Sequence, residues 1–357
     1  MFPFALLVLA YALAARITAA LMGTPALVGY SDYFVCFSSA ILFLPLTHYA
    51  ETIGRDQRPI LIRISESIRA CRRRHLTNAA LIELTACIVL TALLMAAFNA
   101  FKFMLPRLHP FAWDARLELA SRWVHGGRLP YEFLLPIFGG DLPTRFLDVL
   151  YYAVWPVFLW SIFVWQVGGR AESRHQYLLT FASAWVILGT VLAVVFSSAG
   201  PVYYRHLYGG PNPYAPLLEH LGQIHSRHPL MAIRIQNALW NQENAGVASG
   251  GAGVSAMPSL HVAMAELCAI VGRRSGRRPL AYVLTAFSIL TLVASIYLGA
   301  HYALDGYVSI FSVHALWRWA GWVLRKTAAR RRSTFEIWKA TVRPTLEPGP
   351  HSVVGGP

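Results

Sequence analysis

The chain has 357 residues, of which 56% are hydrophobic and 13% charged, roughly half the charged share of a soluble domain. Its formal net charge is +14, but the arginines stand in short runs beside apolar segments instead of forming one basic surface interleaved with aromatic residues. These features exclude a soluble protein and argue against binding to nucleic acid. We expect an all-α, polytopic integral membrane protein.

Apolar stretches close to the roughly 20 residues needed to cross a bilayer recur along the chain. The first follows Met1 without a basic leading region, so we interpret it as a retained span and not as a cleaved signal. It contains Arg16, and the sixth span is short and opens with Pro258. The pattern predicts a helical bundle with about eight transmembrane helices, at residues 3–23, 32–50, 78–104, 146–167, 176–197, 257–272, 280–300 and 302–324.

Arginine placement sets the predicted orientation, because basic residues stay on the cytoplasmic side of short loops. With eight spans, all the arginine-rich runs fall on one face, so both termini are predicted to be cytoplasmic. The runs lie at 55–74, 170–174, 273–278 and 326–332. We expect a two-span region with a basic cytoplasmic loop, a membrane-embedded domain, and a basic cytoplasmic tail that is disordered from Pro344, with bounds 1–76, 77–325 and 326–357.

Two long segments, at about 105–145 and 198–256, are then predicted to face the outer side. The first contains an amphipathic stretch that we expect to be helical and to lie along the membrane interface. Its apolar face carries Trp113, Leu117, Ala120 and Val124. The second segment is rich in proline and ends in a run of Gly, Ser and Ala, which predicts a loop with short helical pieces.

A histidine and an aspartate four positions apart, His301 and Asp305, stand at the outer junction of the last two spans. If this segment is helical, the two share one face, a turn apart. The carboxylate can then hold the proton of one ring nitrogen and leave the other nitrogen free to attack, as in a catalytic triad. The pair alone is weak evidence in a chain with 13 histidines, and the alternative is a hydrogen bond on a helix surface.

A second element, Pro258-Ser259-Leu260-His261, opens the sixth span on the same outer side. Proline suits the first turn of a helix, and the free amides of that turn favour phosphate. His261 would lie close to a group bound there. The alternative is that Pro258 merely starts a helix and that His261 is an interface residue. The predicted topology independently brings both elements to the outer surface, which makes a common site more credible.

These motifs resemble those of the type 2 phosphatidic acid phosphatase superfamily, whose members share a Pro-Ser-x-His element and a downstream His-x-x-x-Asp element. The spelling is most similar to the inositol phosphorylceramide synthase branch, whose second element reads Tyr-Leu-x-x-His-Tyr-x-x-Asp, as residues 297–305 do here. The motif similarity covers mainly 195–310. The segment from Pro110 to Gly127 also resembles an outward amphipathic region of bacterial members, so we expect a bacterial inner membrane protein with its site on the periplasmic or outer face.

The resemblance implies a core of six helices and a metal-independent enzyme that acts without a cofactor on a lipid-linked phosphate, such as a phospholipid, sphingolipid or prenyl phosphate. His301 would attack phosphorus to form a phosphohistidine, and Asp305 would orient it. His261 would protonate the departing oxygen and then activate water or an acceptor hydroxyl. The sequence does not decide between a phosphatase and a phospho-headgroup transferase.

The chain departs from the superfamily pattern at the basic residues. The first element, a lysine followed seven residues later by Arg-Pro, is absent, and Ser295 stands where an arginine normally precedes the nucleophile by six residues. A transferring phosphoryl group needs fixed positive partners. We predict phosphate contacts from Ser259, Tyr204 and Arg205, although Arg205 could instead be a snorkelling arginine within an aromatic belt.

Two further functions compete with this one. A transporter or channel would place charged residues at mid-span, where they are scarce apart from Arg16, Glu83 and Glu266. A metal site would use the two histidines and the aspartate as ligands and would make activity sensitive to chelators. We expect free thiols, neither disulfides nor metal ligands, at the widely spaced Cys36, Cys71, Cys87 and Cys268.

Overall fold

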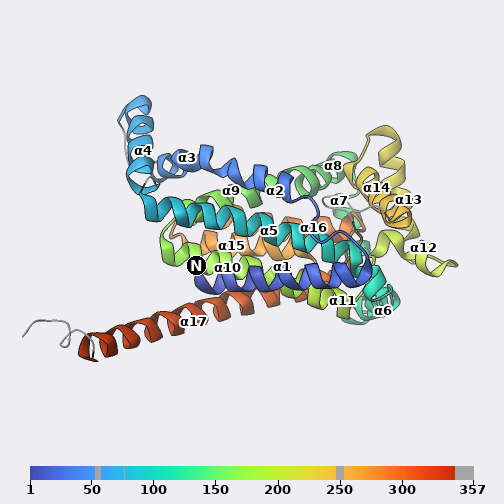
Figure 1. Ribbon diagram of the computed structural model, residues 1–357. Coiled ribbons are helices and arrows are strands. Elements are labelled where there is room, and N and C mark those ends of the chain that lie inside the picture. The colour runs from blue at the N-terminus through green and yellow to red at the C-terminus, as the bar shows by residue number, and fades with distance from the viewer. Residues whose placement is uncertain (53–57, 76, 247–252, 342–357) are drawn as a thin grey trace, which may run out of the picture.

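The computed structural model describes residues 1–52, 58–75, 77–246 and 253–341, which form helices and no strand. A bundle of helices, some of them continuous with short helical pieces, forms the body of the molecule (Figure 1). They are α1 (Phe2–Met22), α2 (Tyr30–Ser38), α3 (Ala40–Thr52), α5 (Asn78–Leu108), α8 (Asp141–Val149), α9 (Trp155–Gly168), α10 (Ala171–Val186), α11 (Ala193–Val195), α15 (Leu260–Arg274), α16 (Arg278–Tyr297) and α17 (Ala303–Thr341). Two π-helical turns, η1 (Leu150–Val154) and η2 (Ile187–Leu192), join α8 to α9 and α10 to α11.

Among the described residues, six segments are long and apolar enough to cross a membrane, which confirms a polytopic helical membrane protein. They are Phe2–Met22, Tyr30–Thr47, Asn78–Leu108, Asp141–Gly168, Ala171–Val195 and Arg278–Tyr297. The other two predicted spans correspond to α15 and α17. The first has only 15 residues, and the second carries Asp305, His314 and Arg318 in its early turns. Both pack against other bundle helices, which reduces their need for an apolar surface.

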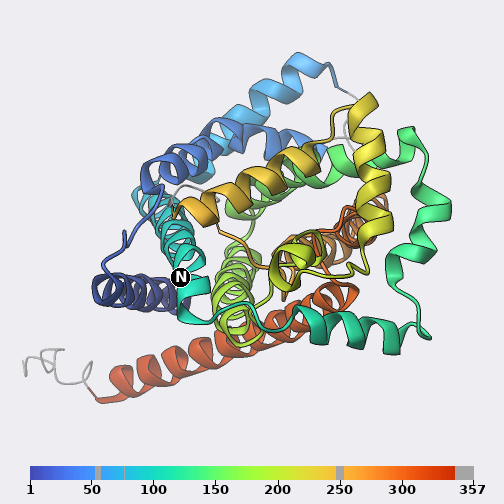
Figure 2. The same ribbon diagram turned by 90° about the vertical axis from the view of Figure 1, so that its right-hand side faces the viewer.

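Shorter helices cover one end of the bundle, where Figure 2 looks onto them. They are α6 (Asp114–Val124), α7 (Pro130–Phe138), η3 (Pro201–Tyr203), α12 (Tyr204–Tyr208), α13 (Ala215–Arg227) and α14 (Met231–Ala245). The segment 198–256 is therefore more helical than expected, with helices of 13 and 15 residues. Pro201 and Pro216 stand in the first turns of their helices, where the missing N–H removes no helical hydrogen bond.

The predicted apolar face of the amphipathic segment is wrong in part. In α6 the buried residues are Asp114, Leu117, Glu118 and Ser121, at helical spacing, whereas the side chain of Val124 is 48% exposed. The polar residues turn inward because Asp114 accepts hydrogen bonds from Ala199, Gly200 and Tyr302 in other segments, while Glu118 pairs with Arg122 on the same helix. The helix thus packs a largely polar stripe against the bundle end.

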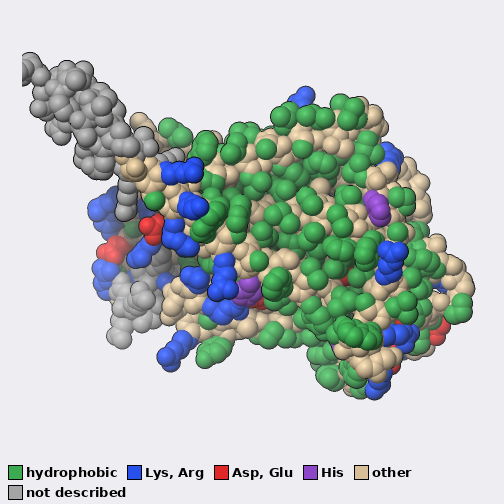
Figure 3. Space-filling model, turned by 90° about the horizontal axis from the view of Figure 1, so that it is seen from below, with side chains coloured by type: hydrophobic (Ala, Val, Ile, Leu, Met, Phe, Trp, Pro, Cys, Tyr) green, Lys and Arg blue, Asp and Glu red, His purple; other side chains and the backbone are tan. Residues whose placement is uncertain are grey.

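The opposite end of the bundle is strongly basic. There α4 (Ile60–His75) carries an arginine run in its last turn, so the predicted basic loop is a helix over its described part. Figure 3 shows Lys and Arg side chains gathered toward this end, beside a broad apolar surface. The N-terminus and the later turns of α17 lie toward the same end (Figure 1). The predicted disordered tail lies outside the described residues, and the three-part division stays a prediction.

Two hydrophobic cores meet inside the bundle. One is formed mainly by α1, α5, α9, α10 and α15, and the other lies between α16 and the short helices. Trp155 and Phe158 pack against both cores. Residues near the start of α9 are therefore held from two sides, which gives the neighbouring site a rigid wall.

Candidate active site

Three connections converge where the short helices cover the bundle: the one after α11, the one before α15 and the one between α16 and α17. Ser198 fixes the second connection, since its carbonyl accepts the N–H of Ala256 at 2.8 Å and its Oγ accepts the N–H of Met257 at 3.0 Å. Gly200 has φ 108°, and a Cβ there would lie 2.6 Å from the Ala300 carbonyl oxygen. Only glycine allows this approach, so the first and third connections are held in direct contact.

His301 and Asp305 are brought together, but not on one helix as the spacing suggested. Gly299, at φ 69°, follows the end of α16, and α17 begins only at Ala303, so His301 lies between the two helices. Asp305 is in the first turn of α17 and folds back. Its Oδ2 accepts the N–H of Tyr302 at 2.9 Å and lies 3.3 Å from Nδ1 of His301. The carboxylate therefore caps a helix and orients a histidine at once.

A backbone carbonyl also holds the His301 ring. Nδ1 of His301 lies 2.9 Å from the carbonyl oxygen of Ala256, closer than it lies to Asp305. A carbonyl oxygen can only accept, so Nδ1 carries a proton, and in the neutral imidazole Nε2 is then the nitrogen with the lone pair. Asp305 is fully buried and His301 is 7% exposed, so this arrangement is largely shielded from solvent.

His261 is the second residue of α15 and lies across from His301, with 6.3 Å between the ring centroids. Its ring stacks on Tyr151 and packs against Trp155, each at 4.4 Å between centroids. The indole N–H of Trp155 donates to the His261 carbonyl oxygen at 2.9 Å. Tyr151 belongs to the π-helical turn η1, a distortion that is frequent at functional sites.

The element around Pro258 differs from the expected geometry in one respect. Pro258 precedes α15 and does not occupy its first turn, because Ser259 is the cap residue. The Ser259 Oγ accepts the N–H of Val262 at 3.4 Å, and its own N–H donates to the carbonyl oxygen of Asp305 at 3.3 Å. Ser259 therefore joins α15 to α17 and is fully buried.

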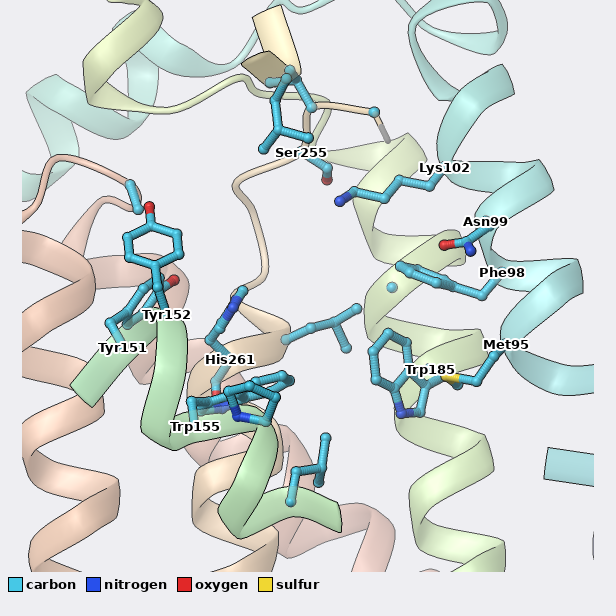
Figure 4. A pocket seen from close by; sticks show the side chains of 18 of the residues that line it. Met95, Phe98, Asn99, Lys102, Tyr151, Tyr152, Trp155, Trp185, Ser255 and His261 are labelled. Atoms are coloured by element: carbon cyan, nitrogen blue, oxygen red, sulfur yellow. The ribbon is translucent and has the colours of Figure 1, made fainter. Parts of the chain in front are cut away.

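Both histidines line a cavity of about 430 Å³ that extends between α2, α5, α9 and α10. Figure 4 shows His261 on one side of it and Lys102, Asn99 and Phe98 on α5 opposite. Apart from polar groups such as the two histidines, Lys102 and Asn99, the lining is mainly apolar and aromatic. It includes Phe37, Met95, Phe98, Leu159, Trp160, Phe163, Phe181 and Trp185. The cavity can thus hold an amphiphile with its polar group at the histidines.

The structure does not bring the three predicted phosphate contacts to this cavity. Ser259 is occupied as a helix cap, and neither Tyr204 nor Arg205 is among the lining residues. Arg205 is exposed, because the short helix α12 carries it on the outer surface. Among the described lining residues, Lys102 is the one lysine or arginine. The sequence reasoning missed it, although an ionisable residue inside a predicted span is itself a signal.

A buried carboxylate, Asp114, supports the site from α6. It accepts the N–H groups of Ala199 at 3.0 Å and Gly200 at 2.8 Å, and the hydroxyl of Tyr302 at 2.9 Å. Burial raises the pKa of Asp114, although these hydrogen bonds act in the opposite direction. Asp114 thereby ties α6 to the residue next to His301. Its sequence position gave no signal, because its partners are remote in the chain.

The alternative of a metal site gains no support from this geometry. Within the described ranges, no three His, Cys, Asp or Glu side chains are arranged to hold a metal ion. Nδ1 of His301 is turned toward a carbonyl and a carboxylate, which is the arrangement of an oriented base or nucleophile.

Fold and site together define a polytopic helical membrane protein in which an oriented histidine and a second histidine, with 6.3 Å between their ring centroids, line a largely apolar cavity. Residues 142–319 match the family model described as the PAP2 superfamily, so this segment is similar to that superfamily. No curated protein and no solved structure gave a significant match. The similarity supports a lipid phosphatase or phosphotransferase type of function, acting on lipid phosphates in membranes.

Proposed function

We propose that the chain is an enzyme that transfers or hydrolyses a lipid-linked phosphoryl group through a phosphohistidine on His301. One observation carries the proposal: the Ala256 carbonyl and Asp305 hold Nδ1 of His301, so that Nε2 is the ring nitrogen left to attack a group in the cavity. A neutral imidazole with a fixed tautomer is a competent nucleophile. The second histidine, His261, lies opposite.

In the first step, Nε2 of His301 attacks phosphorus, and the bond between phosphorus and the leaving oxygen breaks. His261, protonated at this stage, gives its proton to that oxygen. Asp305 balances the positive charge that develops on the His301 ring. The amide groups at the start of α15, with their helix dipole, favour the negative charge on the phosphoryl oxygens.

In the second step, neutral His261 takes a proton from water or from an acceptor hydroxyl, whose oxygen attacks phosphorus. The bond between nitrogen and phosphorus breaks, and His301 returns to its initial form. Water as acceptor gives a phosphatase, and a lipid hydroxyl gives a phosphotransferase. The Pro-Ser-Leu-His spelling favours a phospho-headgroup transfer like that of the inositol phosphorylceramide synthase branch.

The lipid nature of the substrate is supported by the cavity. Its volume of about 430 Å³ lies within the range of ordinary ligand sites, and its aromatic walls suit a hydrocarbon chain. The walls come from helices that are apolar enough to cross a membrane. An acyl or prenyl chain would therefore lie among these helices while its phosphate faces the histidines.

The test is turnover of ³²P-labelled lipids by purified protein in nanodiscs. Phosphatidate, a prenyl diphosphate and phosphatidylinositol are each offered with and without ceramide or diacylglycerol. We expect release of inorganic phosphate or transfer of a labelled headgroup, and no turnover by the His301→Ala variant. Equal turnover by this variant and the unmodified protein would reject the proposal.

A further inference from the structure

Lys102 is the basic residue of the cavity, and the part of the chain that matches the superfamily does not include it. It lies in the last turns of α5, on the same helical face as Met95, Phe98 and Asn99, which also line the cavity. In Figure 4 its side chain extends from α5 toward Ser255, into the space above His261. A snorkelling lysine would turn to the outer surface instead.

Electrostatics couple Lys102 to one of the two histidines. His261 interacts electrostatically with both Lys102 and His301. Cations placed around a general acid favour its release of a proton. An anion bound between Lys102 and the histidines would be attracted from both sides. The lysine therefore lines the same cavity as the proposed nucleophile and interacts with the proposed acid.

The charge of Lys102 is not balanced by the protein. Within the part of the chain that the structure describes, its ammonium has no ion-pair or hydrogen-bond partner, and the carboxylate that interacts with it at longer range is Glu243. Glu243 also interacts with Arg107, and burial raises the pKa of its carboxyl group. One carboxylate thus faces two cations, which leaves about one positive charge at the cavity.

An unpaired ammonium in an apolar cavity is unfavourable unless an anion completes the site. The proposed reaction brings such an anion, and the dipole of α15 supplies only about half a positive charge. The position six residues before His301 supplies no positive charge, because it is occupied by Ser295, which is buried and whose hydroxyl donates to the Leu292 carbonyl. Arg205 lies outside the cavity.

We propose that Lys102 binds the phosphoryl oxygens of the substrate and serves as the fixed cation of this active site. The inference rests on the proposed function. It assigns to α5 the phosphate contact that the absent Lys and Arg-Pro element would otherwise provide. It also predicts that the phosphate of the lipid lies between α5 and the start of α15.

Orthovanadate, a phosphoryl analogue, provides the test through thermal unfolding of the purified protein in detergent. Vanadate should raise the Tm of the unmodified protein, because a ligand stabilises the state that binds it. Lys102→Met should lose this shift, and its vanadate inhibition constant should rise at least about tenfold. Lys102→Arg should keep most of the Tm shift and should have a vanadate inhibition constant close to that of the unmodified protein. Lys326→Met makes the same change at an exposed lysine and should leave both values unchanged.

The Tm measured without vanadate is the control for correct folding of the variants. Methionine preserves length and removes an unpaired charge, so Lys102→Met should unfold at the same or a higher temperature. If it cannot be purified folded, Lys102→Gln replaces it with the same expectation for vanadate. The kcat/KM for the labelled lipid should fall about 10²–10³-fold, as for a lost oxyanion donor, and Lys102→Arg should recover part of it.

The outcomes separate the two proposals. If vanadate stabilises Lys102→Met as much as the unmodified protein, and His301→Ala alone loses the shift, the proposed function stands and the role of Lys102 is rejected. If vanadate stabilises neither the unmodified protein nor any variant, and no lipid is turned over, both are rejected.

Discussion

The imidazole of His301 is held by two acceptors, and this double support has a measurable consequence. In Asp305→Asn the amide oxygen can still accept from Tyr302, and the Ala256 carbonyl can still keep the proton on Nδ1. The variant then loses the negative charge that balances the charge developing on His301, but it keeps the tautomer with the proton on Nδ1. We expect kcat to fall about 10²-fold, as for other supporting partners, and not the roughly 10⁴-fold that follows when a triad histidine takes the wrong tautomer.

Single-turnover measurements on labelled lipid test this expectation, with His301→Ala as the inactive reference. The Tm of Asp305→Asn should stay close to that of the unmodified protein because the cap of α17 is kept. A folded Asp305→Asn variant that is as inactive as His301→Ala would show that the carbonyl does not suffice.

The second histidine should be separable from the first by trapping. His261→Asn slows the first step, which loses its general acid, and also removes the base that activates the acceptor in the second step, so the phosphorylated enzyme that does form should accumulate. Denatured protein should then carry ³²P that is stable in base and labile in acid, as expected for phosphohistidine. The control is the double variant that also has His301→Ala. Label that persists in this control would place the covalent intermediate on another residue.

Among the elements, α6 has the clearest structural role, because Asp114 connects it to two other segments. In Asp114→Asn an amide oxygen in the Oδ1 position can still accept from Ala199, Gly200 and Tyr302, but the NH₂ group in the Oδ2 position then faces the N–H of Ala199. Buried donors left without an acceptor cost about 1–3 kcal/mol. We expect a lower Tm and reduced turnover, because an amide displaced by this clash of donors holds Tyr302, next to His301, less firmly.

Thermal unfolding of Asp114→Asn in detergent measures this effect, and Asp32→Asn is the matched control. Asp32 is an exposed carboxylate in the first turn of α2, where the same change should leave the Tm nearly unaffected. An unchanged Tm in Asp114→Asn would mean that the amide reorients to satisfy its neighbours. Activity lost without a change in Tm would point to positioning of His301 alone.

The helices and the two histidine elements could be predicted because their signals are local. Apolar runs of sufficient length identify spans, and short motifs identify His261, His301 and Asp305. Asp305 does reach the ring of His301, but the condition that both lie on one helix is not met, because a glycine with a left-handed backbone, Gly299, separates α16 from α17. Glycine after an apolar run is a known helix stop signal, so this error had a visible cause in the sequence.

Other features depend on contacts between remote segments, and no local pattern reports them. Asp114 reaches Tyr302 across most of the chain, and the Ala256 carbonyl has no side-chain signature at all. Arg205 was expected near the phosphate because it follows a span, yet α12 carries it to the surface. Lys102 is an intermediate case between local and remote signals. Its place within an apolar span was a local signal, but the cavity that gives it a role forms only in the fold.

At the scale of the whole molecule, the basic end and the site end of the bundle are opposite one another, which permits a direct test of orientation. Arginine-rich ends remain cytoplasmic, so the short helices and the histidines should face outward. Arg72 on α4 and Ser226 on α13 are exposed residues of the two ends. In a background without native cysteines, needed because Cys36 is exposed, each position is replaced by cysteine in turn.

Ser226→Cys should react with a membrane-impermeant maleimide in intact cells, and Arg72→Cys should react only after the cells are permeabilised. This pattern would put the phosphate of the substrate in the outer leaflet, so that the enzyme meets lipids already carried across the membrane. The reverse pattern would turn the histidines to the cytoplasm. The arginine run of α4 would then have to be held on the outer side, against the bias that normally orients such helices.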